Sequence, residues 1–478
     1  MKRLLLVALL LLVLAGATAM AIAVALAPTS TAGSAATFAA ESPRDQCFFV
    51  LAGKNATTDG SVLMGYNNDW SASNYAYLNV VPAASGTYRY VKLMTLGAVP
   101  EGGINEKGLA VCYGVATDLA PEVTTADPYV KKGYGGEMWD LLLQKCATAT
   151  QAVDLLQQMA QTKGFSSACA GSFGIADRTQ AWAFELFGGH HWVAARVPDN
   201  CYYAQPNMPR IRQVNLADPA NFRGSSDLQQ FAVDIGRYDP NSGPFDVAWA
   251  YGDRADMQDF SNTNRLWIAT KRWSPALATD PTMPYATRPV FAVPDHKLSR
   301  QDFMAIHREH FEGTQLDQTN GYALMSPHSQ TNRPVCVAIT DYAAVFQCRS
   351  SLPEGIGTVV WWAASRPCAS TFVPFYAAVT SVPAAYSSRT AYNAFRAVAD
   401  SLDKKGTVGG ELRYKHYIPL VRSVYGTFET ECSNAQASTE ATAAAMAPAD
   451  QSVYLTNYSA QRAAQALSLA QGLPAQMP

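Results

Sequence analysis

The sequence has few charged residues and lacks the motifs of several large enzyme classes. Charged residues make up 15% of the chain, the formal net charge is −2, and no run of Lys or Arg is longer than two. A protein that binds a polyanion needs a basic patch, so the sequence predicts no nucleic-acid partner. The chain also contains no Walker loop and no Gly-x-Ser-x-Gly elbow, which leaves nucleotide chemistry and a serine hydrolase without support.

Motifs for metal binding and thiol redox chemistry are absent too. No Cys-x-x-Cys pair occurs, and the spacing of His307 and His310 differs from that of His-Glu-x-x-His and of its inverse. Histidines three residues apart on one helix are more often surface or core residues than ligands, and His190 and His191 at a strand start are interpreted in the same way. The sequence therefore predicts no metal site and no cofactor.

A hairpin early in the chain carries a thiol at its first residue. Residues 48–52 are apolar and strand-like, 53–60 are rich in turn formers and end in Asp-Gly, and 61–65 form a second apolar run. The return strand would carry Asp69 back toward Cys47. A cysteine at the start of a mature chain has a base in its own α-amine, because the amine titrates near ~8 and the thiol near ~8.5. The alternative is an ordinary buried cysteine in a first strand.

The first 46 residues are typical of export and processing segments. A short basic N-terminus precedes an uncharged apolar run, so residues 1–27 are predicted to be a signal peptide. The run is longer than a usual signal core, which leaves an uncleaved membrane anchor as the alternative. Residues 28–46 form a small-residue propeptide or linker, and exposing the amine of Cys47 needs a second cut after Gln46. We expect a secreted, periplasmic or secretory-lumen protein without stable membrane association after signal removal.

The cysteine count fits an exported chain. Of the nine cysteines, an even number remains when Cys47 is set aside as the nucleophile, which allows up to four disulfides. Free buried thiols are the alternative, and the sequence does not identify which cysteines would pair.

Strand and helix signals alternate in blocks along the rest of the chain. We expect strands at 88–95, 109–116, 173–175, 181–186, 191–197, 201–204, 335–340, 344–348, 358–363 and 371–376, and helices within 135–163 and over 299–310, 389–404 and 454–473, with a loop at 437–449. Thr148 and Ser299 are predicted helix caps. Strands that are apolar on both faces and are flanked by helices suit two sheets covered by helices. Residues 208–300 are rich in loops, where substrate loops would lie.

Several blocks spread over most of the chain beyond residue 46 carry a family likeness. They are Cys47–Asp69 with its Gly-Lys-x-Ala-x-x-Asp-Gly-Ser turn, Gly103–Val111, Gly171–Asp177, Ala181–Glu185, His191–Asp199, His310–Thr314 followed by Asp317, and Thr371–Tyr376. Together these blocks resemble the secreted cysteine dipeptidases of the dipeptidase A type, which are N-terminal-nucleophile hydrolases.

The resemblance implies a fold, a domain arrangement and a reaction. The fold would be α+β, a four-layer αββα sandwich of two mainly antiparallel sheets covered by helices. Residues 47–478 would form a single domain with a C-terminal helical extension. The reaction would be hydrolysis of dipeptides through a thioester acyl-enzyme on Cys47, after a cut that is regarded as self-processing in the family.

The resemblance also implies roles for four further residues. Asp69 would orient the α-amine or the thiol. Asn207, with backbone amides, would hold the oxyanion of the tetrahedral intermediate. Asn105 would position substrate or amine, since penicillin V acylases and bile salt hydrolases carry a similar Asn-Glu-Lys-Gly turn at the active site. Arg265 falls where related hydrolases carry a site arginine. As bare sequence, both asparagines are also ordinary turn residues.

One position departs from the family pattern. An arginine commonly follows the glycine of the return strand, whereas here Gly65 is followed by Tyr66. An arginine lowers the pKa of a thiol electrostatically, but a tyrosine offers only a hydrogen bond. Two alternatives to a dipeptidase therefore stay open: an N-acyl amidase of the penicillin V acylase or bile salt hydrolase type, and a secreted binding protein that kept the fold and lost activity.

The expected partner is a small peptide. A dipeptidase has to recognise a free α-ammonium group, whereas an N-acyl amidase needs an apolar pocket. The carboxylates of Asp118, Glu122 and Asp127, which follow the strand after Asn105, are candidates for meeting that ammonium. The preferred side chains stay open, and so does the oligomeric state, a homo-oligomer included.

Overall fold

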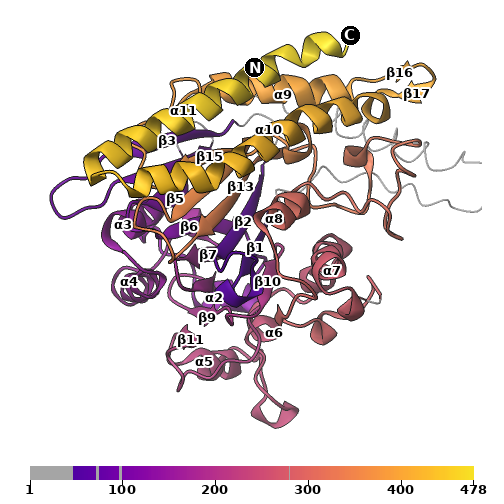
Figure 1. Cartoon of the computed structure of the whole chain (residues 1–478). Coiled ribbons are helices and arrows are strands. Elements are labelled where there is room, and N and C mark those ends of the chain that lie inside the picture. Colours follow the sequence, from indigo (N-terminus) through magenta and orange to yellow (C-terminus); the bar gives the residue numbers. More distant parts are fainter. Residues whose placement is uncertain (1–46, 71–74, 96–98, 279) are drawn as a thin grey trace, which may run out of the picture. The chain divides into compact units, whose positions relative to one another are not determined.

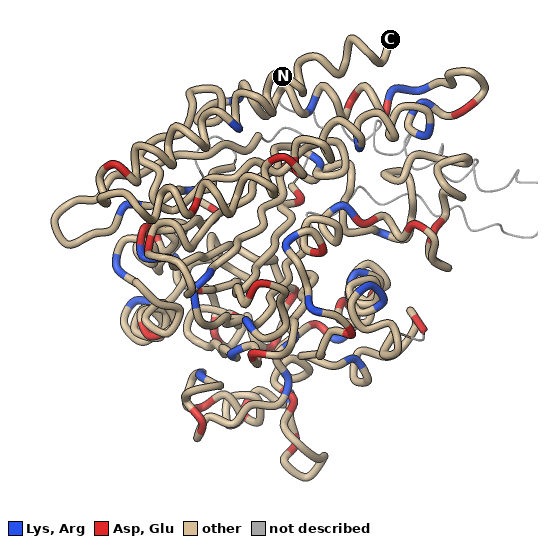
Figure 2. The backbone as a smooth tube through the Cα atoms, viewed as in Figure 1, with Lys and Arg blue, Asp and Glu red and all other residues tan. Residues whose placement is uncertain are grey.

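The computed structural model describes residues 47–70, 75–95, 99–278 and 280–478. The predicted signal peptide and propeptide, residues 1–46, lie outside the described residues. Within the described part of the chain, no helix combines the length and the apolar composition that crossing a bilayer requires. Figure 2 shows Lys and Arg interspersed with Asp and Glu along the backbone.

The first sheet has seven strands and contains the predicted N-terminal hairpin. All its neighbouring strands are antiparallel. In spatial order they are β12 (Phe291–Ala292), β10 (Tyr202–Gln205), β1 (Phe48–Ala52), β2 (Val62–Asp69), β13 (Thr340–Cys348), β14 (Thr358–Ala364) and β15 (Val373–Tyr376). The hairpin pairs Phe48 with Asn67, so the end of β2 lies beside Cys47, as the sequence predicts.

The second sheet has eight strands and is also antiparallel throughout. In spatial order they are β11 (Phe222–Gly224), β9 (Trp192–Arg196), β8 (Ala181–Leu186), β7 (Ser172–Ala176), β6 (Ala110–Val115), β5 (Val99–Asn105), β4 (Tyr90–Thr95) and β3 (Tyr77–Val81). A small third sheet pairs β16 (Thr407–Val408) with β17 (Glu411–Leu412).

The two large sheets face each other and small residues bring them close together. Strands β1 and β2 contact β6, β7 and β8. A Cβ on Gly114 would lie 2.5 Å from the ring of Phe49, and a Cβ on Gly174 would lie 2.7 Å from the sulfur of Met64. Larger residues there would push the sheets apart, so these glycines fix the spacing of the layer behind Cys47.

Helices cover the outer faces of both sheets (Figure 1). On the eight-stranded sheet lie α3 (Glu137–Lys145) and α4 (Ala149–Thr162), and on the seven-stranded sheet lie α8 (Arg300–His307), α9 (Arg389–Asp403) and α11 (Pro448–Gly472), with α10 (Arg413–Ala444) against α9 and α11. The remaining α-helices are short or connect the layers: α2 (Pro121–Ala126), α5 (Leu228–Asp234), α6 (Val247–Tyr251) and α7 (Phe260–Trp273). The predicted α+β, four-layer αββα sandwich of two antiparallel sheets is therefore confirmed.

Local signals placed the starts of two capped helices correctly, whereas the first part of α10 was not predicted. Thr148 begins α4 and Ser299 begins α8, each through a capping box in which side chain and backbone exchange hydrogen bonds. The predicted loop at 437–449 is wrong over most of its length, because α10 runs to Ala444 and α11 starts at Pro448. Alanine has the highest helix propensity, so an alanine-rich stretch becomes helical where it can bury one face. The predicted strand at 335–340 is also wrong, since β13 begins only at Thr340.

The cysteines do not form a disulfide framework in the described part of the chain. All nine are buried free thiols. The allowance for up to four disulfides is therefore not realised, and the alternative of buried thiols holds.

Candidate active site

The hairpin register places the Cys47 thiol against the backbone of Asp69. The N–H of Asp69 donates to Sγ at 3.5 Å, and the thiol donates to the carbonyl oxygen of Asp69 at 3.8 Å. Cys47 itself is buried. Cys47 immediately precedes β1, and Asp69 is the last residue of β2, so the pairing of these two strands sets where the thiol lies.

The side chain of Asp69 is anchored by two groups from a distant segment. Its Oδ1 accepts from the hydroxyl of Thr340 at 2.6 Å, and its Oδ2 accepts from Arg333 at 2.8 Å. Burial raises the pKa of Asp69 above its ordinary value, while the charge of Arg333 opposes that rise. The carboxyl group is thus oriented from both sides at the end of β2.

Tyr66 takes a direct part in the surroundings of the thiol. Its hydroxyl donates to Sγ of Cys47 at 3.4 Å and accepts from Nδ2 of Asn68 at 2.9 Å. Residues two apart on a strand share a face, which is why Tyr66 and Asn68 meet. Asn68 also donates to the carboxyl of Glu101 at 3.4 Å. The residue that replaces the expected arginine therefore supplies a hydrogen-bond donor to the sulfur.

Two arginine side chains from distant parts of the chain lie at the site. Arg265 of α7 is fully buried, and its guanidinium donates to the backbone carbonyl of Cys47 at 2.5 Å and to Oδ1 of Asn207 at 3.0 Å. Burial, followed by the charge of Arg333, lowers the pKa of Arg265 to about 9. Two arginines thus lie around Cys47 although its neighbour on the return strand is a tyrosine.

Asn207 lies at the end of β10 and is joined to Cys47 through Arg265. Its Oδ1 accepts from Arg265, and its Nδ2 donates to the carbonyl of Ala116 at 2.9 Å. The structure therefore brings Cys47, Asp69, Asn207 and Arg265 together. The amide that the resemblance assigns to the oxyanion is occupied by a backbone carbonyl in this state.

Asn105 is not brought to the thiol. Its Nδ2 donates to the carbonyls of Leu143 and Cys146 at 2.8 and 2.7 Å, and its Oδ1 accepts from the N–H groups of Lys107 and Leu109. All four partners are backbone groups of its own turn and of the end of α3. The geometry gives Asn105 a structural role in the turn, so we do not carry its predicted positioning role forward.

The surroundings of Cys47 favour a neutral thiol as long as the Gln46–Cys47 bond is uncut. Burial, followed by the charge of Asp69, raises the pKa of Cys47 to about 12. A thiol with such a pKa is protonated at neutral pH and is a poor nucleophile. Activation therefore requires a base next to the sulfur.

Several residues of this site were missed by sequence reasoning. The sequence marks Tyr66 only as a departure from the family pattern, and it contains no motif that points to Arg333, Thr340, Asn68 or Glu101. The sequence offers one weak signal at Arg333, which precedes Pro334 in a polar loop. In the structure Arg333 adopts a left-handed backbone with φ of 47°. The others have no local signal, because their roles depend on contacts between distant segments.

Replacing Tyr66 by phenylalanine is expected to lower kcat/KM by about 10- to 150-fold, because one hydrogen bond to the thiolate, about 1.5–3 kcal/mol, is lost. Steady-state kinetics measure this loss. Tyr342→Phe is the matched control, since Tyr342 lies against the ring of Tyr66 and its buried hydroxyl makes no hydrogen bond within the described chain. Equal losses in both variants would contradict the assignment.

Glu101 gives the wild-type protein a specific pH dependence of stability. Burial raises the pKa of Glu101 to about 8, from an ordinary value of 4.5. The unfolded chain loses this proton first, so the contribution to stability is full below about pH 4.5 and is lost as the pH rises through about 8. Glu101→Gln should remove that loss and flatten the fall of Tm between about pH 5 and pH 8.

Thermal unfolding across that pH range tests this expectation. The exposed Glu354, which pairs with Lys107, provides the control substitution Glu354→Gln. A wild-type Tm that falls with pH no more steeply than that of Glu101→Gln would show that the Glu101 carboxyl is not held protonated.

The predicted loop carboxylates have different surroundings. Asp127 accepts from the rings of His190 and His191 at 2.9 and 2.7 Å, and Glu122 pairs with Arg237 at 3.6 Å, so both are engaged away from Cys47. Asp118 is exposed, two residues beyond the carbonyl of Ala116 that holds Asn207. It is the one of the three that lies on a segment in contact with the site.

An acidic group also lies near Arg265. Burial, followed by the charge of Asp118, raises the pKa of Asp256 to about 7. The Oδ2 of Asp256 accepts from Nδ2 of Asn262, and the Oδ1 of Asn262 in turn accepts from Arg265. Acidic side chains are thus clustered on the Asp118 side of the site, and their mutual repulsion helps to raise the pKa of Asp256.

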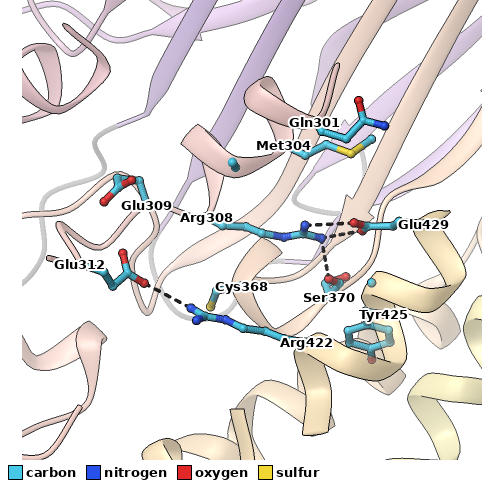
Figure 3. A pocket seen from close by; sticks show the side chains of 12 residues that line it. Gln301, Met304, Arg308, Glu309, Glu312, Cys368, Ser370, Arg422, Tyr425 and Glu429 are labelled. Carbon is cyan, nitrogen blue, oxygen red and sulfur yellow. Dashed lines mark hydrogen bonds and ion pairs between the residues drawn. The ribbon is translucent and has the colours of Figure 1, made fainter. Parts of the chain in front are cut away.

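A cavity of about 290 Å³ lies elsewhere, between α8 and α10. Figure 3 shows Arg308 reaching Glu429 and Ser370 across it, and Arg422 reaching Glu312. Cys47 does not line this cavity, so we do not assign it to the chemistry of the thiol.

Comparisons of the sequence with known proteins point to one family. The sequence model of peptidase family C69 matches residues 81–399, a range that begins after the hairpin of Cys47. The chain is 30% identical over 357 residues to a Salmonella dublin protein named "Probable dipeptidase", covering 69% of this chain and 80% of that one. It is 27% identical over 383 residues to "Probable dipeptidase A" of Streptococcus pyogenes serotype M1, covering 74% and 79%. A solved structure of penicillin V acylase from Agrobacterium tumefaciens matches with 12% identity and a TM-score of 0.29, over 69% of this chain and 86% of that one.

Proposed function

The chain belongs to peptidase family C69 and is a cysteine-type dipeptidase, and we propose that it is exported and cleaves dipeptides through a thioester on Cys47. The observation that carries this proposal is the set of polar contacts to Cys47. Tyr66 and Asp69 donate to its sulfur, and Arg265 donates to its carbonyl. A thiol with only a core role needs no such partners.

The first step of the proposed mechanism is activation of the thiol. Cleavage after Gln46 gives Cys47 a free α-amine, which accepts the proton of Sγ. The hydroxyl of Tyr66 and the N–H of Asp69 then stabilise the thiolate. The carboxyl group of Asp69, fixed by Arg333 and Thr340, orients the new ammonium group.

The second step is acyl transfer. The sulfur attacks the carbonyl carbon of the dipeptide, and the resulting oxyanion accepts from Nδ2 of Asn207, which first has to leave the carbonyl of Ala116. The ammonium of Cys47 returns its proton to the leaving amine, the C–N bond breaks and a thioester remains. Water, deprotonated by the same amine, hydrolyses the thioester and restores the thiol. Arg265 is a positioning residue that links Cys47 to Asn207.

Export is part of the proposal and rests on the sequence. Residues 1–27 would be a signal peptide and 28–46 a propeptide, and both lie outside the described residues. The mature domain would then be residues 47–478. No disulfide joins the buried thiols in the described chain, so its stability in an oxidising compartment would come from its core rather than from disulfides.

The substrate is proposed to be an unblocked dipeptide. The acidic group around Asp118 and Asp256 would meet the free α-ammonium of the substrate. Acetylation removes that charge and leaves an acceptor unpaired, so kcat/KM for N-acetylated dipeptides should be lower by about 10- to 150-fold or more. Assay of one dipeptide panel in free and N-acetylated form, with penicillin V and a conjugated bile salt alongside, measures the difference.

The panel separates the alternatives. Preference for the acylated compounds would indicate an N-acyl amidase. No turnover of any compound by protein with a free Cys47 amine would indicate a binding protein. Asp118→Asn is the matched variant: it should reduce the preference for free over acetylated dipeptides, whereas Glu122→Gln, whose carboxylate pairs with Arg237, should not.

A further inference from the structure

Four side chains that can bind a metal ion meet near the end of α8. His310 follows α8, His328 lies in a short helical turn, Cys336 precedes β13 and Cys368 precedes β15. One donor atom of each residue lies within 4.8 Å of the donor atoms of the other three. The Nε2 of His328 lies 3.4 Å from the Sγ of Cys368. Four segments that are far apart in sequence thus converge on one point.

Both histidines are oriented by carboxylates on the side away from the cluster. The Nδ1 of His310 lies 3.2 Å from the carboxylate of Glu312, and the Nδ1 of His328 lies 3.0 Å from that of Asp403. Glu312 is itself held by Arg422 at 3.2 Å. Histidine ligands of metal ions typically donate their second ring nitrogen to a carboxylate, which fixes the ring and leaves the other nitrogen for the metal.

The Nε2 of His310 faces the thiol of Cys368 but forms no hydrogen bond of ordinary geometry with it. It is buried and makes no hydrogen bond within the described part of the chain. A buried polar atom without a partner is costly, and buried side-chain nitrogens are nearly always satisfied in folded proteins. The contact between His328 and Cys368 leaves the Nε2 of His310 without a hydrogen bond to any described residue. An ion at the centre of the cluster would give this nitrogen a partner.

We propose that His310, His328, Cys336 and Cys368 bind one zinc ion. Two thiols and two imidazoles are the ligand set of a closed tetrahedral zinc site, and sulfur ligands disfavour magnesium and calcium. Binding displaces the two thiol protons, and the two thiolates neutralise the charge of the ion, so the buried site carries no net charge. A zinc tetrahedron has donor-to-donor edges of about 3.3–3.8 Å, so closure requires the side chains to move by only about an ångström.

The site would be structural rather than catalytic. Its four protein ligands leave no open position for water or substrate. It would fasten the segment between His310 and Cys336 to the turn that carries Cys368. That segment contains Arg333, whose guanidinium donates to Asp69 beside the thiol. Zinc would therefore hold a residue of the active site in place from a distance.

The cavity between α8 and α10 offers a route for the ion. Cys368 and Glu312 both line it, and Figure 3 shows Cys368 beside the Glu312–Arg422 pair. No local motif marks this site, because the ligands are widely spaced in the sequence. His307, the histidine nearest to His310 in sequence, is not part of the cluster: it lies against Gly65 of β2, where a Cβ would be 2.1 Å from its Nε2.

Metal analysis of the purified full chain tests the proposal. Protein produced with zinc supplied, and then passed through metal-free buffer, should contain about one zinc per chain by elemental mass spectrometry. Cys368→Ser and His310→Ala should lose most of it, while Cys432→Ser, a change of another buried thiol outside the cluster, should keep it. A strong chelator should lower the Tm of the wild-type protein by about 5 °C or more, and should not change that of Cys368→Ser.

A second measurement uses the wild-type protein alone, in case a variant fails to fold. Zinc should protect Cys336 and Cys368 from alkylation, and cobalt in place of zinc should give the visible absorption of a tetrahedral thiolate complex. Protein that holds no zinc and takes up none, or peptide mapping that finds a Cys336–Cys368 disulfide, would overturn the proposal. Zinc content does not depend on hydrolysis, so failure of the proposed function would leave this result intact.

Discussion

Cys47→Ser is expected to reduce dipeptide hydrolysis by at least about 10³-fold, because loss of a catalytic nucleophile removes up to about 10⁶-fold of turnover. A serine hydroxyl at this position would still face the α-amine, but its proton is far harder to remove than that of a thiol. The residual rate would reflect binding and the oxyanion donor alone. Initial rates at saturating dipeptide measure the loss, and trapping of a covalent acyl-enzyme should succeed only with the wild-type protein.

The control for this change is Cys112→Ser. Cys112 is buried on the facing sheet, where its sulfur lies 3.5 Å from that of Met64. A serine there places a hydroxyl in an apolar layer, so the variant should lose stability but keep its rate per folded molecule. If the cut after Gln46 is self-processing, as the resemblance implies, Cys47→Ser will also prevent that cut. Both variants should therefore be compared as chains whose residue 47 has been exposed by a separate protease. Wild-type turnover by Cys47→Ser would show that the thiol is structural.

Protein that retains Gln46 is expected to be inactive. With the Gln46–Cys47 bond intact, the nitrogen of Cys47 is an amide and cannot accept a proton, and burial keeps the pKa of the thiol at about 12. Loss of the general base alone costs about 10²–10⁴-fold. The active fraction of a preparation should therefore equal the fraction of chains that start at Cys47.

Two measurements on the same samples during maturation compare these fractions. Peptide mapping gives the fraction of chains that start at Cys47, and active-site titration gives the active fraction. Gln46→Pro should slow the cut, because proline restricts the backbone of the residue before it and fixes its own. An Ala substitution at Arg44, two residues farther from the bond, serves as the matched control. Full activity in chains that still carry Gln46 would rule out the α-amine as the base.

The sequence determined those features that depend on neighbouring residues. The hairpin from Phe48 to Asp69 follows from two apolar runs and an Asp-Gly turn, and its register carries Asp69 to Cys47. The capping boxes at Thr148 and Ser299 mark helix starts because the side chain and the backbone that pair are three residues apart. The layered αββα fold follows from apolar strands flanked by helices.

Only the tertiary structure decided which distant groups meet. Arg265 and Arg333 reach Cys47 and Asp69 from more than two hundred residues away in sequence. Asn105 shows that a local motif can mislead. Its turn resembles the active-site turn of related amidases, but in the structure its side chain binds the end of α3. The cluster of His310, His328, Cys336 and Cys368 likewise cannot be predicted from the sequence, because its four side chains come from segments that are far apart along the chain. A local pattern fixes hydrogen bonds between neighbours, whereas the polar contacts of a buried site are set by how whole elements pack.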